Sequence, residues 1–265
     1  SKALTTTVSI KLRPSKRVQI NTVLSSGFRN PNIDDIGKIR ENNGLLVVPN
    51  TFLKPEYAYN LDLGVDFRSL NNTNYISLRG FSTIISRHIG RDEYIVFSDT
   101  TTPDLSTIIY NGEEVTTISN KNLGNRFIHG FSIDGFSKIM SNLKLDYGLT
   151  YTKGDNNDTY GPLPSISPLF GSIALSYSKR GFNLKAVYKF SEAKNPSDYS
   201  FGGEDGLDET PFIVNSEGLL TYLGTPKWSN LSIYGSKNIS SNVTLRMGLA
   251  NVFDSHYRTF ASGIS

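Results

Sequence analysis

Apolar and polar residues alternate along many segments of this chain with the period of two that is typical of β-strands. In residues 57–68 the odd positions are all large and apolar, whereas the even positions include Asp62, Asp66 and Arg68. Residues 142–152, 182–190 and 242–250 repeat this pattern clearly. Weaker copies lie at residues 4–12, 18–24, 74–87, 126–136, 170–177 and 228–236. The pattern therefore predicts an all-β chain with about ten strands.

The connections between these segments alternate strictly between short and long. Short turns are expected at residues 13–16, 70–74, 137–142, 178–181 and 239–242. Long connections are expected at residues 28–56, 88–124, 154–168 and 194–227. In an up-and-down antiparallel sheet, successive connections lie at opposite ends of the strands. All short turns then share one end and all long loops the other, which is the asymmetry of an outer-membrane β-barrel.

Alternation alone is compatible with a membrane barrel and with a soluble β-sandwich, whose apolar faces pack on each other. Segment length favours the barrel, because a tilted membrane strand needs roughly 9–11 residues and strands elsewhere average about 5–6. Aromatic residues near the ends of the apolar faces, such as Tyr57, Tyr151 and Tyr188, resemble interfacial girdles. We therefore predict a transmembrane, antiparallel, up-and-down β-barrel. Its polar face, with residues such as Asp62 and Lys185, is expected to line a wide interior.

Composition excludes several other classes of function. The 265 residues are 37% hydrophobic, yet no apolar run approaches the roughly 20 residues of a membrane helix. A net charge of +3 with scattered Lys and Arg does not indicate a nucleic-acid surface. The chain has no Cys, its three His residues are far apart, and it shows no nucleophile elbow or phosphate loop. We therefore expect no enzyme, no catalytic residue, no metal site and no cofactor.

Three motifs resemble those of TonB-dependent outer-membrane receptors. Residues 25–35, SSGFRNPNIDD, look like the FRAP box of that family, with Asn30 in place of the usual Ala. Residues 48–56, VPNTFLKPE, resemble its NPxLKPE segment, and residues 251–264, NVFDSHYRTFASGI, resemble its NLFDxxYRxxxSG ending. The motifs occur in the order of the family and extend over nearly the whole chain.

The resemblance implies a 22-stranded barrel closed around an N-terminal plug. Residues 1–265 would then be the C-terminal part of the barrel, without the plug domain and the last strand. It also implies a location in the bacterial outer membrane, contact with its lipid, and a TonB complex that acts through an absent N-terminal segment.

The function that the resemblance implies is TonB-energised uptake of a scarce nutrient such as haem, a ferric siderophore or cobalamin. Details of the motifs favour the haem or haemoglobin receptors, but residues 32–49 contain no His that would ligate haem. The ligand therefore stays open. A passive porin-like channel and a soluble β-sandwich binding module remain as alternatives.

Ligand-contacting residues are expected in the external loops, because loops on a rigid scaffold commonly carry binding. The candidates are Arg29, Asn32 and Asp34 in the first motif, Tyr199, Phe201 and Tyr222 in the glycine-rich connection, and Tyr257 and Arg258 in the last motif. The motif residues also have structural explanations, since Asn and Asp side chains bond backbone donors in turns.

Two long connections carry further expectations. The aromatic residues of 194–227 are compatible both with a mobile lid and with a small packed core. Within residues 88–124, the segments 93–98 and 107–111 are expected to form a hairpin above the membrane.

Overall fold

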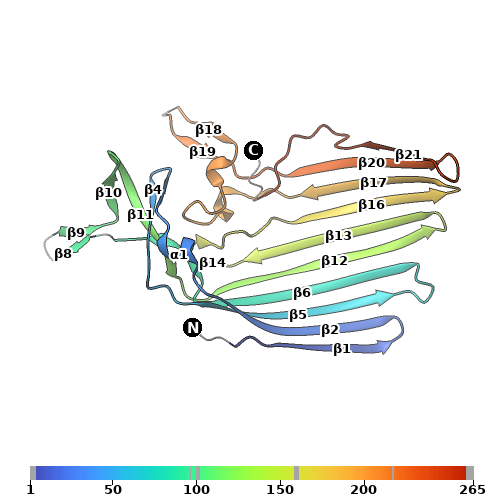
Figure 1. Cartoon of the computed structure of the whole chain (residues 1–265), viewed down its shortest axis with the longest axis horizontal. Coiled ribbons are helices and arrows are strands. Elements are labelled where there is room, and N and C mark those ends of the chain that lie inside the picture. Colours follow the sequence, from blue (N-terminus) through green and yellow to red (C-terminus); the bar gives the residue numbers. More distant parts are fainter. Residues whose placement is uncertain (1–3, 96, 100–101, 158–160, 217, 261–265) are drawn as a thin grey trace.

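The ten predicted strands form one antiparallel sheet. The computed structural model describes residues 4–95, 97–99, 102–157, 161–216 and 218–260. Neighbouring strands of the sheet follow one another in chain order, as an up-and-down topology requires. Their bounds are β1 (Thr7–Ser15), β2 (Val18–Arg29), β5 (Glu56–Arg68), β6 (Asn74–Ser86), β12 (Arg126–Met140), β13 (Leu143–Gly154), β16 (Phe170–Lys179), β17 (Phe182–Ser191), β20 (Trp228–Asn238) and β21 (Thr244–Leu249). Figure 1 shows them as one broad open sheet with β1 and β21 at its edges.

The short turns lie together at one end of this sheet (Figure 1). A two-residue turn joins β16 to β17 through Arg180 and Gly181, whose φ angles are 47° and 74°. A two-residue hairpin turn of type I′ needs a left-handed backbone at both central positions, and glycine adopts it without strain. The predicted up-and-down arrangement is confirmed.

The apolar face of the ten-stranded sheet is exposed, which is the reverse of the arrangement in a soluble protein. In β5 the apolar Leu61, Leu63 and Phe67 are 37%, 51% and 43% exposed, whereas Asp66 is only 9% exposed. The Asp66 carboxylate accepts hydrogen bonds from Asn21 Nδ2 at 2.9 Å and Tyr75 Oη at 3.1 Å. The apolar faces therefore do not meet one another across a second layer, as they would in a sandwich.

The long connections contain short elements of their own. These are α1 (Ile33–Gly37), β3 (Arg40–Asn42), β4 (Leu45–Val48), β7 (Ile89–Glu93), β8 (Phe97–Asp99), β9 (Thr102–Leu105), β10 (Thr107–Tyr110), β11 (Glu113–Asn122), β14 (Asn156–Asn157), β15 (Gly161–Pro162), η1 (Pro196–Asp198), η2 (Leu207–Glu209), β18 (Phe212–Val214) and β19 (Leu220–Tyr222). Within the described parts of the chain, no helix has the length and apolar character needed to cross a membrane.

The hairpin expected between residues 93–98 and 107–111 is wrong. β10 pairs with β11, and β7 also pairs with β11, further along that strand. Asn111 and Gly112, with φ angles of 52° and 90°, form the turn that returns the chain from β10 to β11. Asn-Gly between two strand-like runs is a strong hairpin signal, and here it outweighs the apolar pattern of residues 93–98. Residue 96 of that prediction lies outside the described residues.

Candidate ligand-binding site

All four long connections leave the sheet at the end opposite the short turns (Figure 1). Two of them, residues 28–56 and 88–124, combine into a second, five-stranded sheet. In this sheet β11 pairs in parallel with β4, so strands from different connections lie side by side. We call this unit the loop sheet. It is a folded structure and not a set of independent loops.

The loop sheet has its own apolar core. Ile118 of β11 is fully buried, and Val115 is 2% exposed. Leu46 of β4 and Ile89 of β7 are also buried, at 3% and 6% exposed. Among the described residues, almost all buried apolar side chains belong to the long connections, and the ten-stranded sheet contributes only Ala174. This end of the molecule is therefore preorganised by ordinary hydrophobic packing.

The residues of the first motif stabilise the segment that leads from β2 into the loop sheet. The guanidinium of Arg29 forms ion pairs with Asp35 at 2.6 Å and with Glu56 at 2.8 Å. Asn32 caps α1: its side chain accepts a hydrogen bond from Asp35 N, and the Asp35 carboxylate accepts one from Asn32 N. Asp34 is exposed in the first turn of the same helix. Arg29 and Asn32 thus have clear structural roles at this position.

An acidic segment, residues 202–209, joins the long connections to one another. Each of its four carboxylates contacts a different partner, and most of these partners lie in other connections. The pairs are Glu204 with Arg91, Asp205 with Lys194 and Ser165, Asp208 with Asn42 and Asn43, and Glu209 with Arg258. Burial raises the pKa of the Glu204 carboxyl, an effect that the nearby Arg91 opposes. Through these contacts the acidic segment links the loop sheet to the other long connections.

Tyr199 and Lys194 form a packed core in the last long connection. The Lys194 ammonium is 3.1 Å from the Asp205 carboxylate and 3.9 Å from the ring centre of Phe260. Burial lowers the pKa of Lys194, and Asp205 opposes that change. Tyr199 is 6% exposed, and its hydroxyl lies 2.6 Å from Thr225 Oγ1. Tyr199 thus belongs to a small packed core, whereas Phe201 and Phe212 of the same connection are 42% and 54% exposed.

A cavity of about 620 Å³ lies between the loop sheet and the acidic segment. Its lining includes Lys38, Arg40, Arg91, Phe201, Glu204 and Tyr222. We call it the interloop cavity. Its volume lies in the range of about 300–1,000 Å³ that is usual for small-molecule sites. The structure thus brings together two of the predicted residues, Phe201 and Tyr222, at one concave surface.

The residues of the last motif pack beside this assembly. Tyr257 stacks on Trp228 with ring centres 4.4 Å apart. Arg258 donates hydrogen bonds to the Glu209 carboxylate and to the Glu209 carbonyl, the latter at 3.2 Å. Neither residue lines the interloop cavity. A ligand role for them, as for the first motif, stays a prediction.

The prediction missed the basic side chains of the cavity. Lys38 and Arg40 follow α1, and Arg91 lies on β7. Arg91 is far in sequence from Lys38 and Arg40, and none of the three belongs to a motif. The Asn43-Gly44 pair, with φ angles of 51° and 75°, is a signal for the β3–β4 hairpin that would have placed Arg40 on a strand.

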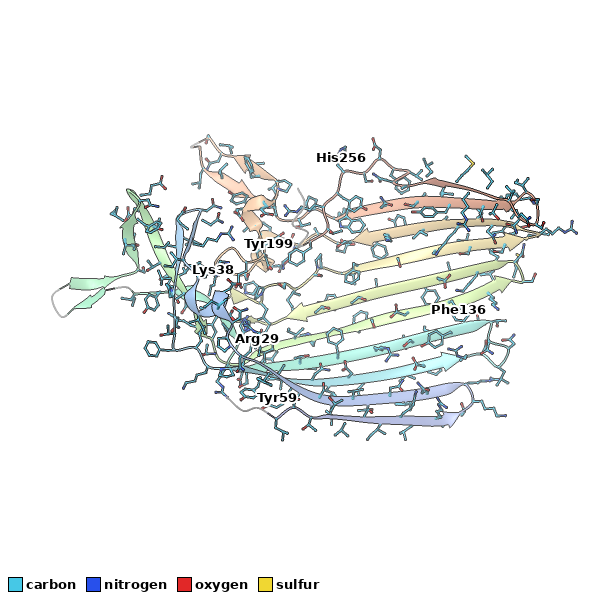
Figure 2. All side chains as sticks on the ribbon, in the orientation of Figure 1. Arg29, Lys38, Tyr59, Phe136, Tyr199 and His256 are labelled. Atoms are coloured by element: carbon cyan, nitrogen blue, oxygen red, sulfur yellow. The ribbon has the colours of Figure 1, made fainter. Side chains whose placement is uncertain are left out.

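The histidines do not cluster. His88 is 9% exposed, with Nδ1 3.6 Å from the Glu56 carboxylate. His256 is exposed on the final connection (Figure 2). In the parts of the chain that the structure describes, no group of three or more side chains is arranged to hold a metal ion.

Ten antiparallel strands with an exposed apolar face, short turns at one end and folded loops at the other define the class of outer-membrane β-barrels. Residues 2–252 match the family described as TonB dependent receptor-like, beta-barrel. The chain therefore belongs to the TonB-dependent receptor family, as part of its barrel. Members of this family are receptors and transporters of the bacterial outer membrane, and they are not enzymes.

Two curated relatives cover most of this chain. Hemoglobin-binding protein A of Haemophilus influenzae is 26% identical over 271 residues, which include 95% of this chain and 24% of that protein. Hemoglobin-haptoglobin utilization protein B of Neisseria meningitidis serogroup A is 25% identical over 264 residues, with 94% of this chain and 31% of that protein covered. The chain thus spans about a quarter to a third of the length of these relatives.

Solved structures share the fold. The siderophore receptor PirA of Acinetobacter baumannii matches with a TM-score of 0.69 at 18% identity, over 94% of this chain and 37% of that chain. The copper transporter OprC matches with a TM-score of 0.67 at 19% identity, over 96% of this chain and 34% of that chain.

Proposed function

We propose that this chain is part of an outer-membrane receptor that takes haem from haemoglobin and imports it with energy supplied through TonB. The barrel would sit in the outer membrane with its exposed apolar face against lipid. The plug domain and the TonB-contacting segment would be supplied by parts of the protein outside residues 1–265.

The observation that carries the proposal is the folded assembly at the long-loop end. A receptor for a small chelate needs little more than a pocket, whereas a protein ligand needs a broad and preorganised surface. The loop sheet has a buried core at Ile118 and Val115, and the acidic segment fastens the other connections to it. This arrangement suits a ligand of protein size.

The exposed side chains of this assembly support the same proposal. Phe52 is 87% exposed and Ile109 is 70% exposed, and the β18–β19 hairpin exposes several more apolar residues. A protein ligand bound at this end would bury such side chains, and apolar and aromatic side chains are enriched in the buried centres of protein interfaces. The relatives named for hemoglobin binding and for hemoglobin-haptoglobin utilization align over 94–95% of this chain, which supports haemoglobin as the protein ligand.

Growth with a single iron source tests the proposal. The full-length protein is expressed in a bacterium that lacks its own haem receptors, with haemoglobin, haemin, ferric enterobactin or no iron added. We expect growth on haemoglobin and on haemin, and loss of both when TonB is deleted. Growth on ferric enterobactin alone would overturn the choice of ligand. Growth that does not depend on TonB would instead favour a passive channel.

A further inference from the structure

We propose that the interloop cavity binds the carboxylate end of an amphipathic ligand, whose apolar body lies against one face of the β18–β19 hairpin. This inference rests on the proposed function and deepens it. Haem belongs to the ligand class concerned, because it combines an apolar macrocycle with two carboxylates. The inference therefore identifies where the receptor would hold haem at its external end.

The cavity offers positive charge that the protein itself does not neutralise. Lys38 and Arg40 line it, and neither side chain forms an ion pair or hydrogen bond with the described residues. The carboxylates of the same lining are already engaged: Glu204 lies 3.6 Å from Arg91, and Asp208 accepts a hydrogen bond from Asn43 at 2.7 Å. The lining holds three cations, Lys38, Arg40 and Arg91, against two carboxylates, so an incoming carboxylate would meet net positive charge.

Two buried polar atoms at the cavity form no hydrogen bond. Ser200 Oγ has none, and Arg91 Nε lies 3.6 Å from the Glu204 carboxylate, beyond hydrogen-bond distance; both residues line the cavity. A buried polar atom without a hydrogen bond is unfavourable and needs an explanation, and a bound ligand group is one such explanation. Both atoms can donate to a carboxylate oxygen.

The hairpin beside the cavity supplies an apolar face. Phe212 pairs with Tyr222 across the hairpin and Val214 pairs with Leu220, so these four side chains share one face. Tyr222 lines the cavity, while Phe212, Val214 and Leu220 are 54%, 58% and 47% exposed. An isolated two-stranded hairpin is marginally stable in water, and exposed apolar side chains do not improve this. An apolar ligand body on this face would bury them.

Binding of two porphyrins to the purified full-length receptor tests the inference. Haemin carries two free carboxylates, and haemin dimethyl ester has the same macrocycle with both carboxylates blocked. We expect the receptor to bind haemin at least about tenfold more tightly than the ester, as one charged hydrogen bond would provide. The Lys38→Ala/Arg40→Ala variant should lose about tenfold in affinity for haemin and keep its affinity for the ester.

Two further variants separate the parts of the proposed site. Phe212→Ser/Leu220→Ser should weaken the binding of both porphyrins, because it removes the apolar face. Lys54→Ala removes an exposed cation from the same connection, outside the cavity lining, and should change neither affinity. Thermal unfolding of each variant checks that the receptor remains folded.

The outcomes distinguish this inference from the proposed function. Equal binding of haemin and its ester, or a Lys38→Ala/Arg40→Ala variant that binds haemin like the wild type, would overturn the subsite. The receptor would still be a haem importer if it supports growth on haemoglobin. A wild-type receptor that binds neither porphyrin overturns the subsite, and failure to grow on haemoglobin independently overturns the function.

Discussion

At the scale of single residues, the side chains of the long-loop end mostly connect segments that are distant in sequence. Arg29 joins the end of β2 to α1 and to the start of β5 through Asp35 and Glu56. Asp205 holds Lys194 and also accepts a hydrogen bond from Ser165 N at 2.7 Å. Charged residues are rarely buried unless they are paired, and here the pairing sets the positions of the loops.

Lys194 provides the sharpest test at this scale. Its side chain is 3% exposed and that of Asp205 is 2% exposed. Lys194→Met would leave a buried carboxylate without its cation, so we expect local destabilisation by about 3–5 kcal/mol. Hydrogen exchange of the amides in residues 194–225 measures this. Lys194→Met/Asp205→Asn should lose less than the single variant, and equal losses would contradict the pairing argument.

At the scale of elements, the long connections fold because they share strands. β11 is the central strand of the loop sheet, with β4 on one side and β7 and β10 on the other. Its Thr117 and Ser119 are fully buried, and their hydroxyls donate to backbone carbonyls of other segments. Hydrogen bonds of this kind satisfy polar groups that would otherwise be costly to bury.

Removal of part of the loop-sheet core should act locally. Ile118 is fully buried on β11, so Ile118→Ala should destabilise the loop sheet by about 2–5 kcal/mol. The ten-stranded sheet should be unaffected, because its strands pair only with one another. Hydrogen exchange resolved by segment should show lost protection in β4, β7 and β10. Ile109→Ala, at a site 70% exposed on β10, is the matched control and should change little.

At the scale of the whole molecule, the inversion of the two sheet faces determines the environment that the chain needs. Leu175 on β16 is 41% exposed and belongs to the apolar face. Ser176 is on the opposite face, flanked in register by Lys144 and Lys185. Such a sheet would expose a large apolar surface in water, whereas in a bilayer the same surface is buried in hydrocarbon.

A pair of adjacent substitutions tests this orientation in the full-length receptor. Leu175→Arg should destabilise the barrel by roughly 2–4 kcal/mol, the cost of a cation near the bilayer midplane. Ser176→Glu also introduces a charge, one residue further on, but between two lysines on the polar face, so it should be tolerated. Urea unfolding in lipid vesicles measures both. A soluble sandwich would be indicated if Leu175→Arg were harmless in vesicles.

The sequence by itself determined the ten strands, their up-and-down order and the separation of short turns from long loops. Period-two alternation depends only on which face of a strand meets lipid, and this is a local property of each segment. The motifs were sufficient to indicate the family, because each is a contiguous run of residues that can be compared without knowledge of the fold. The same local pattern placed β5, for example, within one residue of its observed start.

Only the tertiary structure decided how the long connections fold and which residues share a site. β4 pairs in parallel with β11, and Lys38, Arg91 and Phe201 line one cavity. Both arrangements bring together segments that are far apart in sequence. The period-two pattern does not predict such contacts, because they depend on loop closure and on packing between connections. For the same reason Tyr199, expected as a contact residue, is buried in a loop core against Thr225.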